Sequence, residues 1–214
     1  QECASKSKNS MPIFFGAVSN PEQHGIPGKN VTGLAFDNND IEEQVMALEA
    51  VAPHLKRILI LYNPTGRGGI TDKLQKLLTK AFYKWKKIVT TLPVFSADEI
   101  MQKLPQYLKN IDCVVTLRDP TPNASLEYIA KLCTNRGIVT YASALSALKQ
   151  GPCCAYGNTD YDGGVEIAKA FIALVEKHAD FNKTPVSHAH PQYKIVVNHN
   201  VARKVGLFSR TPGL

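Results

Sequence analysis

Small and polar residues follow the predicted strands at the points where the chain leaves each strand. Their hydroxyl, amide, acidic and basic groups suit hydrogen bonding to a small polar ligand. No His, Cys or Glu stands among them, so no pair of nucleophile and base is indicated. We therefore predict a ligand-binding site and a protein that is not an enzyme. Any one of them can instead form a turn or cap a helix. The candidates are Ser19, Asn20, Thr65, Gly68, Gly69, Arg118, Asp119, Thr121, Ser143 and Asp160.

Two further motifs are similar to sites of a more specific chemistry, namely anion binding and metal binding. The segment 65–69, Thr-Gly-Arg-Gly-Gly, joins a strand to a helix, as phosphate-binding loops do. It lacks the GK[ST] ending and the GxGxxG spacing, so a flexible turn is favoured and an anion site with Arg67 is the alternative. His188 and His190 form an HxH pair, but no acidic or cysteine partner stands nearby. We predict no metal and no cofactor.

The charge of the chain bears on its partners, and its cysteine content bears on the state of its thiols. The chain carries 25 Lys and Arg against 18 Asp and Glu, a net charge of +7, yet no nucleic-acid motif accompanies it. We therefore predict no nucleic-acid partner. The five cysteines contain no CxxC pair, and their odd number leaves at least one thiol unpaired within the monomer. We expect them to be small buried side chains. One lysine stripe at helical spacing is expected to face solvent, with docking onto an anionic partner or membrane surface as the alternative: Lys73, Lys76, Lys80, Lys84 and Lys87.

The elements that must position these residues alternate regularly along the chain. Repeated strand–helix units indicate parallel sheets with helices on both faces, where ligands lie beyond the carboxyl ends of the strands. Residues 179–191 are predicted to form a polar loop, and helix 160–178 is predicted to turn Phe171, Ile172 and Val175 inward. Strands are predicted at 11–18, 31–35, 57–62, 88–94, 113–117, 138–141, 153–156 and 193–198, and helices at 40–51, 71–87, 97–108, 123–135, 143–149, 160–178 and 199–205.

An ordered series of motifs resembles one family of ABC-transporter substrate-binding proteins, whose characterised members are linked to aromatic amino-acid uptake. Residues 15–21 (FGAVSNP) are similar to its F-A-x-V-S-D-P, and residues 27–33 (PGKNVTG) to its P-G-G-N-V-T-G. Residues 56–64 (KRILILYNP) are similar to its K-R-V-x-x-L-Y-N-P. Tyr141-Ala142-Ser143, Ala155-Tyr156-Gly157, Asp160-Tyr161 and the end of the chain to residue 207 continue the series.

The resemblance implies a type I periplasmic-binding fold, with two Rossmann-like lobes and the ligand between them. Residues 1–52 would form a partial first lobe and 53–152 the second lobe, with 153–214 shared. Family members carry a further βαβα portion before the segment that matches Met11, so the first lobe would be incomplete. The acid of the family's S-D-P is Asn20 here, and its T-D-N-T loop keeps Asp119 and Thr121 beside Arg118. Fewer acids suit a more anionic ligand, with Arg118 as its partner, and they suit equally a protein that has lost ligand binding.

The resemblance also implies a function and partners. The chain would be the solute-binding component of an ABC importer, taking a small polar or aromatic amino-acid-like ligand and a membrane permease as partners. It would be periplasmic or extracytoplasmic, with its export signal outside these residues, and it could form a homodimer. The alternative is a truncated or repurposed sensory or scaffold domain without transport function.

Overall fold

The structure is a computed structural model that describes residues 11–18, 21–26, 30–36, 40–189 and 193–208. The chain forms two compact units. Unit 1 draws on residues 1–40 and 158–192, and unit 2 on residues 41–157 and 193–214. Helix α2 (Ile41–Val51), which we assigned with 1–52 to the first lobe, packs within unit 2. The lobe limits themselves stay a prediction.

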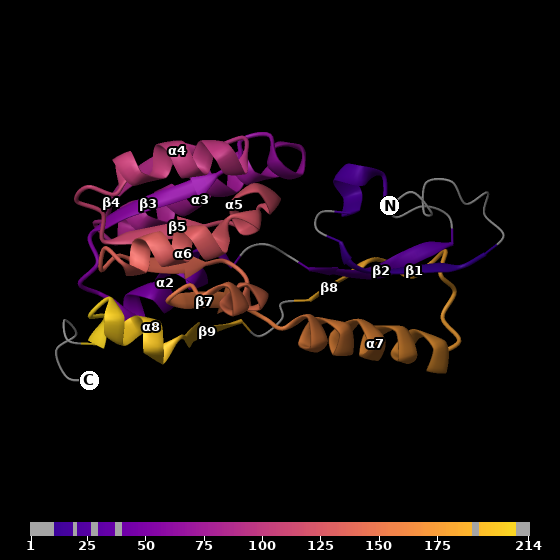
Figure 1. The fold of residues 1–214 in the computed structure, drawn as a ribbon. Coiled ribbons are helices and arrows are strands. Elements are labelled where there is room, and N and C mark those ends of the chain that lie inside the picture. Colours follow the sequence, from indigo (N-terminus) through magenta and orange to yellow (C-terminus); the bar gives the residue numbers. More distant parts are fainter. Residues whose placement is uncertain (1–10, 19–20, 27–29, 37–39, 190–192, 209–214) are drawn as a thin grey trace. The chain divides into compact units, whose positions relative to one another are not determined.

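Unit 2 is built on a six-stranded sheet in the order β4-β3-β5-β6-β7-β9 (Figure 1). The first five strands are parallel, as predicted, but β9 runs antiparallel to β7. The chain leaves the carboxyl end of β7 for unit 1 and returns directly into β9. A parallel neighbour of β7 would need a crossover connection to the opposite end of the sheet, so β9 runs antiparallel. The strands are β3 (Arg57–Tyr62), β4 (Ile88–Pro93), β5 (Cys113–Thr116), β6 (Val139–Ala142), β7 (Cys154–Gly157) and β9 (Lys194–Val197).

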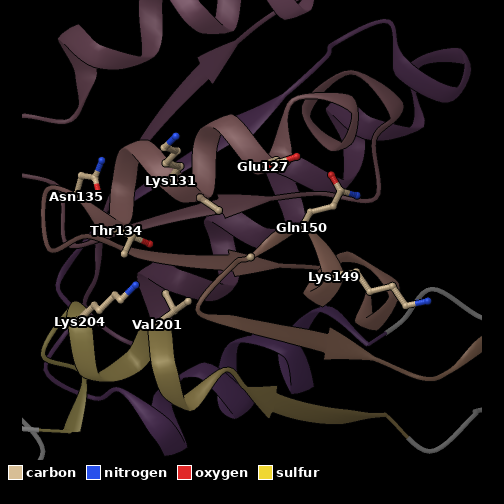
Figure 2. Close-up of a pocket in the computed structure, with 10 residues that line it drawn as sticks. Glu127, Lys131, Thr134, Asn135, Lys149, Gln150, Val201 and Lys204 are labelled. Carbon is tan, nitrogen blue, oxygen red and sulfur yellow. The ribbon is translucent and has the colours of Figure 1, made fainter.

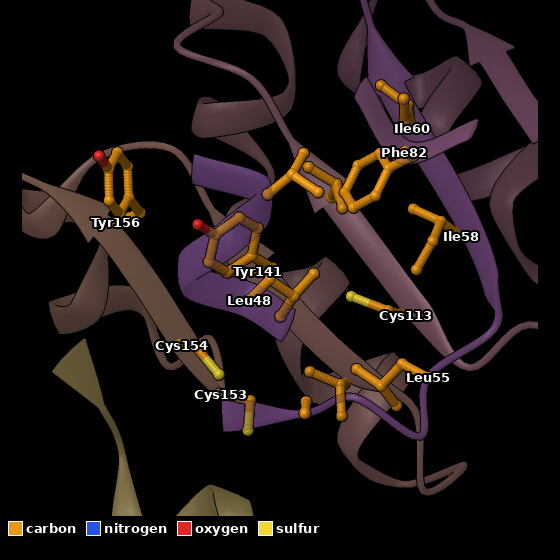
Figure 3. Close-up of a cluster of buried hydrophobic side chains, with 14 of the residues drawn as sticks. Leu48, Leu55, Ile58, Ile60, Phe82, Cys113, Tyr141, Cys153, Cys154 and Tyr156 are labelled. Carbon is orange, nitrogen blue, oxygen red and sulfur yellow. The ribbon is translucent and has the colours of Figure 1, made fainter. Parts of the chain in front are cut away.

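Helices bury both faces of this sheet, which explains the unbroken apolar sequence of β3. Ile58 and Ile60 point into one core with α2, α3 (Ile70–Lys84) and α8 (His199–Lys204), as Figure 3 shows for the strand and α3. Leu59 and Leu61 point into the other, with α4 (Ala97–Tyr107) and α6 (Leu126–Thr134). Each buried side chain of this size contributes about 1.5–3 kcal/mol. The alternation therefore places successive side chains of β3 in two separate cores.

The helix ends of unit 2 agree with the prediction at Ser96 and differ from it in two other helical segments. Ser96 caps α4 as predicted, its Oγ accepting a hydrogen bond from Glu99 N at 3.2 Å. The predicted helix 123–135 begins earlier and is interrupted at Ser125, forming α5 (Pro120–Ala124) and α6. Asp119 caps α5 with Pro120 in the first helical position, a start signal that the apolar spacing did not reveal. The predicted short helix 143–149 is a 3-10 helix over Leu145–Gln150.

The lysine stripe is shorter than predicted, because α3 ends at Lys84. Lys87 lies beyond the helix with only 4% of its side chain exposed, and its Nζ is 2.8 Å from Glu49 Oε1. It also donates a hydrogen bond to Leu55 O at 2.6 Å. Burial raises the pKa of Glu49 above its ordinary value, although Lys87 acts in the opposite direction. Lys87 is therefore part of the core, and Lys84 pairs with Glu42.

Unit 1 is a three-stranded parallel sheet, β1-β2-β8, covered by α7 (Asp160–Glu176). Strands β1 (Ile13–Val18) and β2 (Val31–Phe36) match the prediction, whereas β8 (Ser187–Ala189) lies inside the predicted loop 179–191. Pairing with β2 forms this short strand, which has no apolar alternation of its own. A methyl group at Gly16 would lie 2.7 Å from Ile167, so glycine permits the close approach of α7.

The exposed face of α7 contradicts the prediction that its apolar residues turn inward. Phe171, Ile172 and Val175 were expected to turn inward, but they are 43%, 52% and 50% exposed. Phe171 does reach the sheet, since its ring lies 5.3 Å from that of Phe14. A sheet of three strands, one of them three residues long, is too narrow to cover the remainder of an apolar face this wide.

Candidate functional site

The carboxyl ends of β3 and β5 are joined by a network of hydrogen bonds centred on Asn63. Its Nδ2 donates to Thr121 Oγ1 at 2.9 Å, and its Oδ1 accepts from Thr65 N at 3.0 Å and from Thr65 Oγ1 at 2.8 Å. Two predicted site residues, Thr65 and Thr121, are thus brought together by a residue that we had not selected. The sequence signal for Asn63 was that it is a polar residue directly after β3, the kind of position from which the other candidates were selected.

Asp119 lies beneath this network and is fully buried. Its carboxylate accepts hydrogen bonds from Asn63 N and from Thr121 N, the latter at 3.0 Å. The same side chain caps α5. Because both carboxylate oxygens are engaged by the backbone, the chemistry of Asp119 suits positioning the loops rather than direct contact with a ligand.

Arg118 forms a second group at the same edge of the sheet, at the ends of β5, β6 and β7. Its Nε donates to Ser143 O at 2.7 Å, and its guanidinium lies 5.9 Å from the centre of the Tyr193 ring. That ring stacks on Tyr156 at 5.5 Å. A methyl group at Gly157 would lie 3.1 Å from Arg118 Nη2, so glycine leaves room for the guanidinium. Among the residues that the structure describes, no carboxylate pairs with Arg118.

A helix residue that we did not predict supports this group. Gln44 is buried on α2, and its Nε2 donates to Ser143 Oγ, while its backbone carbonyl accepts from Tyr141 Oη at 2.8 Å. A polar side chain beside Val45 on the inward face of an apolar helix was the signal in the sequence. The partner could not be read from the sequence, because Gln44 and Ser143 are 99 residues apart.

The remaining predicted residues are dispersed. Gly68 and Gly69 lie in the 3-10 turn Gly66–Gly69 with φ of +68° and +87°, values that favour glycine and give both a structural reason. Asp160 is the exposed first residue of α7 in unit 1, where Thr159 caps the helix. Ser19 and Asn20 lie outside the described residues, and so does the side chain of Arg67.

The histidine pair and the cysteines are the side chains with metal-binding or thiol chemistry. His188 Nε2 lies 3.7 Å from Glu22 Oε1, and the second histidine of the HxH pair, His190, is outside the described residues. In the described parts of the chain no cluster of three His, Cys, Asp or Glu could hold a metal ion. Four described cysteines are buried free thiols: Cys113, Cys133, Cys153 and Cys154.

Comparison with known proteins defines the family. The sequence matches the family of ABC transporter substrate binding proteins over residues 1–210. The chain belongs to this family. A search of curated proteins gave no match.

Three solved structures have a fold similar to that of this chain. A conserved domain protein from Vibrio cholerae is 22% identical, with a TM-score of 0.72 over 97% of this chain and 73% of that one. An ABC domain from Streptococcus pneumonia, solved with L-Trp, is 23% identical, with a TM-score of 0.73 over 94% and 69%. A substrate binding protein with adhesive properties from Clostridium difficile, in a ligand-free open form, is 19% identical, with a TM-score of 0.75 over 99% and 72%.

These similarities confirm the predicted fold class and the predicted family. The chain has the α/β architecture of type I periplasmic-binding proteins, with mostly parallel sheets. Membership supports a solute-binding role, and the family is of a kind that typically binds rather than transforms its ligand. Within the described residues, no helix combines the length and the apolar character needed to cross a bilayer.

Proposed function

We propose that this protein is the solute-binding component of an ABC importer and holds a small amino-acid-like ligand, polar or aromatic, against the carboxyl edge of the unit 2 sheet. The ligand would be enclosed between the two lobes of a type I fold. The observation that carries the proposal is Arg118, a half-buried guanidinium at this edge without a carboxylate partner in the described residues.

The geometry of Arg118 suits recognition of a carboxylate. Its Nε is occupied by Ser143 O at 2.7 Å, which fixes the plane of the guanidinium and leaves the Nη groups to donate. Guanidinium groups bind carboxylates through two parallel hydrogen bonds, and a fixed plane reduces the entropy lost on binding. The Tyr193 ring stabilises the cation from one face. An α-carboxylate is therefore the group we assign to Arg118.

Hydroxyl and amide groups would complete the recognition of the ligand. Thr65, Thr121 and Ser143 stand at the same edge, and the loop Gly68-Gly69 follows Thr65. Ser19, Asn20 and Asp160 remain proposed ligand-binding residues. Asp119 is proposed to act by positioning Asn63 and Thr121.

The mechanism requires binding and release, with no bond made or broken. The lobes would close around the ligand, and the liganded protein would then dock, outside the cytoplasm, onto a membrane permease, as the family implies. No catalytic residue is assigned, since the candidate groups contain no nucleophile paired with a base.

A thermal-shift screen against the amino acids and small organic anions tests the proposal. L-Trp is the first compound to try, because the Streptococcus structure contains it. A ligand at 100 times its Kd stabilises the native state by about 2.7 kcal/mol, which a shift of melting temperature reports.

The matched pair of variants is R118A and R136A. Arg136 is an exposed arginine that donates to Pro105 O at 2.9 Å, away from the proposed site. We expect R118A to abolish the ligand-induced shift and R136A to retain it. A flat response of the unaltered protein across the whole screen would favour the repurposed sensory or scaffold domain instead.

A further inference from the structure

A cavity lies on unit 2, between the carboxyl-terminal ends of three helical segments (Figure 2). It has a volume of about 500 Å³, within the usual range for sites of small molecules. Its lining comes from α6, from α8 and from the end of the 3-10 helix Leu145–Gln150. None of the residues assigned to the proposed solute site lines it.

Three lysines line this cavity: Lys131, Lys149 and Lys204. Each stands in the last turn of its helical segment, where a cation is favoured by about 0.3–1 kcal/mol through the helix dipole. That preference explains each lysine separately, but it does not explain why all three line one hollow. In the described part of the chain none of them forms an ion pair. Glu127 is the single acid in the lining, so the cavity has a net positive charge.

The lining combines this charge with neutral hydrogen-bonding groups and an apolar surface. Figure 2 shows Thr134 and Lys204 on one side of the hollow and Gln150 on the other. Ala130 and Gly151 form an apolar part of the lining, where a methyl group built on Gly151 would lie 3.9 Å from Ala130 Cβ. Such a surface can accept the body of an organic molecule while the lysines bind its anionic group.

We propose that this cavity is a second ligand site, which binds a small polyanion of the phosphate type, and that it is independent of the solute site at Arg118. Lysine ammonium groups bind phosphate oxygens as point charges and need no fixed plane, which suits exposed side chains from three separate segments. The apolar lining favours a phosphate that carries an organic body, such as a nucleotide, over an inorganic one.

Isothermal titration calorimetry with inorganic triphosphate and with ATP tests the proposal on the full chain. Because the chain carries a net charge of +7, general attraction of anions must be separated from a site. The matched variants are K131Q/K204Q, in the cavity, and K73Q/K80Q, which removes the same charge from exposed positions of α3. We expect triphosphate affinity to fall about tenfold or more in the first and by about twofold or less in the second.

Two further results are expected. ATP should bind more tightly than triphosphate, because its base can use the apolar lining. R118A should leave both affinities unchanged, which separates this site from the proposed solute site. Equal weakening by the two lysine pairs, or no binding of either anion at millimolar concentration, would overturn the proposal.

Discussion

Replacing Asp119 with alanine should destabilise unit 2 substantially, because this buried carboxylate joins two loops at the sheet edge. The change leaves the buried Asn63 N–H without its acceptor, at a cost of about 1–3 kcal/mol. It also removes the cap of α5, which costs about 0.5–2 kcal/mol. We expect the free energy of unfolding to fall by about 3 kcal/mol. D119N keeps one acceptor oxygen, so it should cost about 1–2 kcal/mol.

Urea denaturation followed by tryptophan fluorescence measures this effect. The single tryptophan, Trp85, lies next to α3 in unit 2, so the signal reports that unit. With a slope of about 2 kcal/mol per molar urea, D119A should lower the midpoint by about 1.5 M. The control is D98A, which removes an exposed carboxylate from the first turn of α4 and should cost about 0.5 kcal/mol or less. A D119A midpoint equal to that of D98A would refute the positioning role of Asp119.

Three other predictions concern buried or paired side chains. K87M should lower the free energy of unfolding of unit 2 by about 3–5 kcal/mol in the same urea assay, because Glu49 stays buried without its partner. The double variant K87M/E49Q should recover most of this loss. Equal stability of K87M and K87M/E49Q would contradict the prediction. D112N should cost about 1 kcal/mol at pH 7, since the pairing with the 45%-exposed Arg57 is screened. Burial acts to raise the pKa of Asp112, but hydrogen bonds from Arg57 and Lys56 outweigh it and hold that pKa below its ordinary value. The stabilisation is therefore full above pH 3.8 and is lost as the pH falls further, so urea midpoints of D112N and the parent should converge there. In a C3S variant, the four described cysteines should react with a thiol reagent only after unfolding. The reason is that burial raises the pKa of Cys133 to about 12 and the pKa of Cys113 well above its ordinary value. Rapid reaction of the native protein would contradict the buried core.

Much of unit 2 could be predicted from local sequence. Strand β3 was predicted at its observed limits, because an apolar run between Arg57 and Asn63 is buried on both faces. Ser96 marked the start of α4 through its cap. The rule that polar residues after parallel strands share one edge agrees with the observed proximity of Thr65 and Thr121, which both bond to Asn63.

The missed features depend on contacts between distant parts of the chain. Strand β8 exists through pairing with β2, about 150 residues away in sequence, and nothing in Ser187–Ala189 distinguishes it from a loop. The exposure of Ile172 depends on how wide the sheet under α7 is, which helical spacing does not report. Asn63 and Gln44 were overlooked because their roles are defined by partners 58 and 99 residues away.

The most direct test of the proposed function is a calorimetric comparison of an amino acid with its decarboxylated analogue. The amino acid is the best ligand from the thermal-shift screen, for example L-tryptophan against tryptamine, and both compounds are titrated into the unaltered protein and into R118A. If Arg118 binds the carboxylate, the unaltered protein should prefer the amino acid by about tenfold or more, and R118A should bind both compounds equally weakly. An R118A protein that still prefers the amino acid would contradict the account.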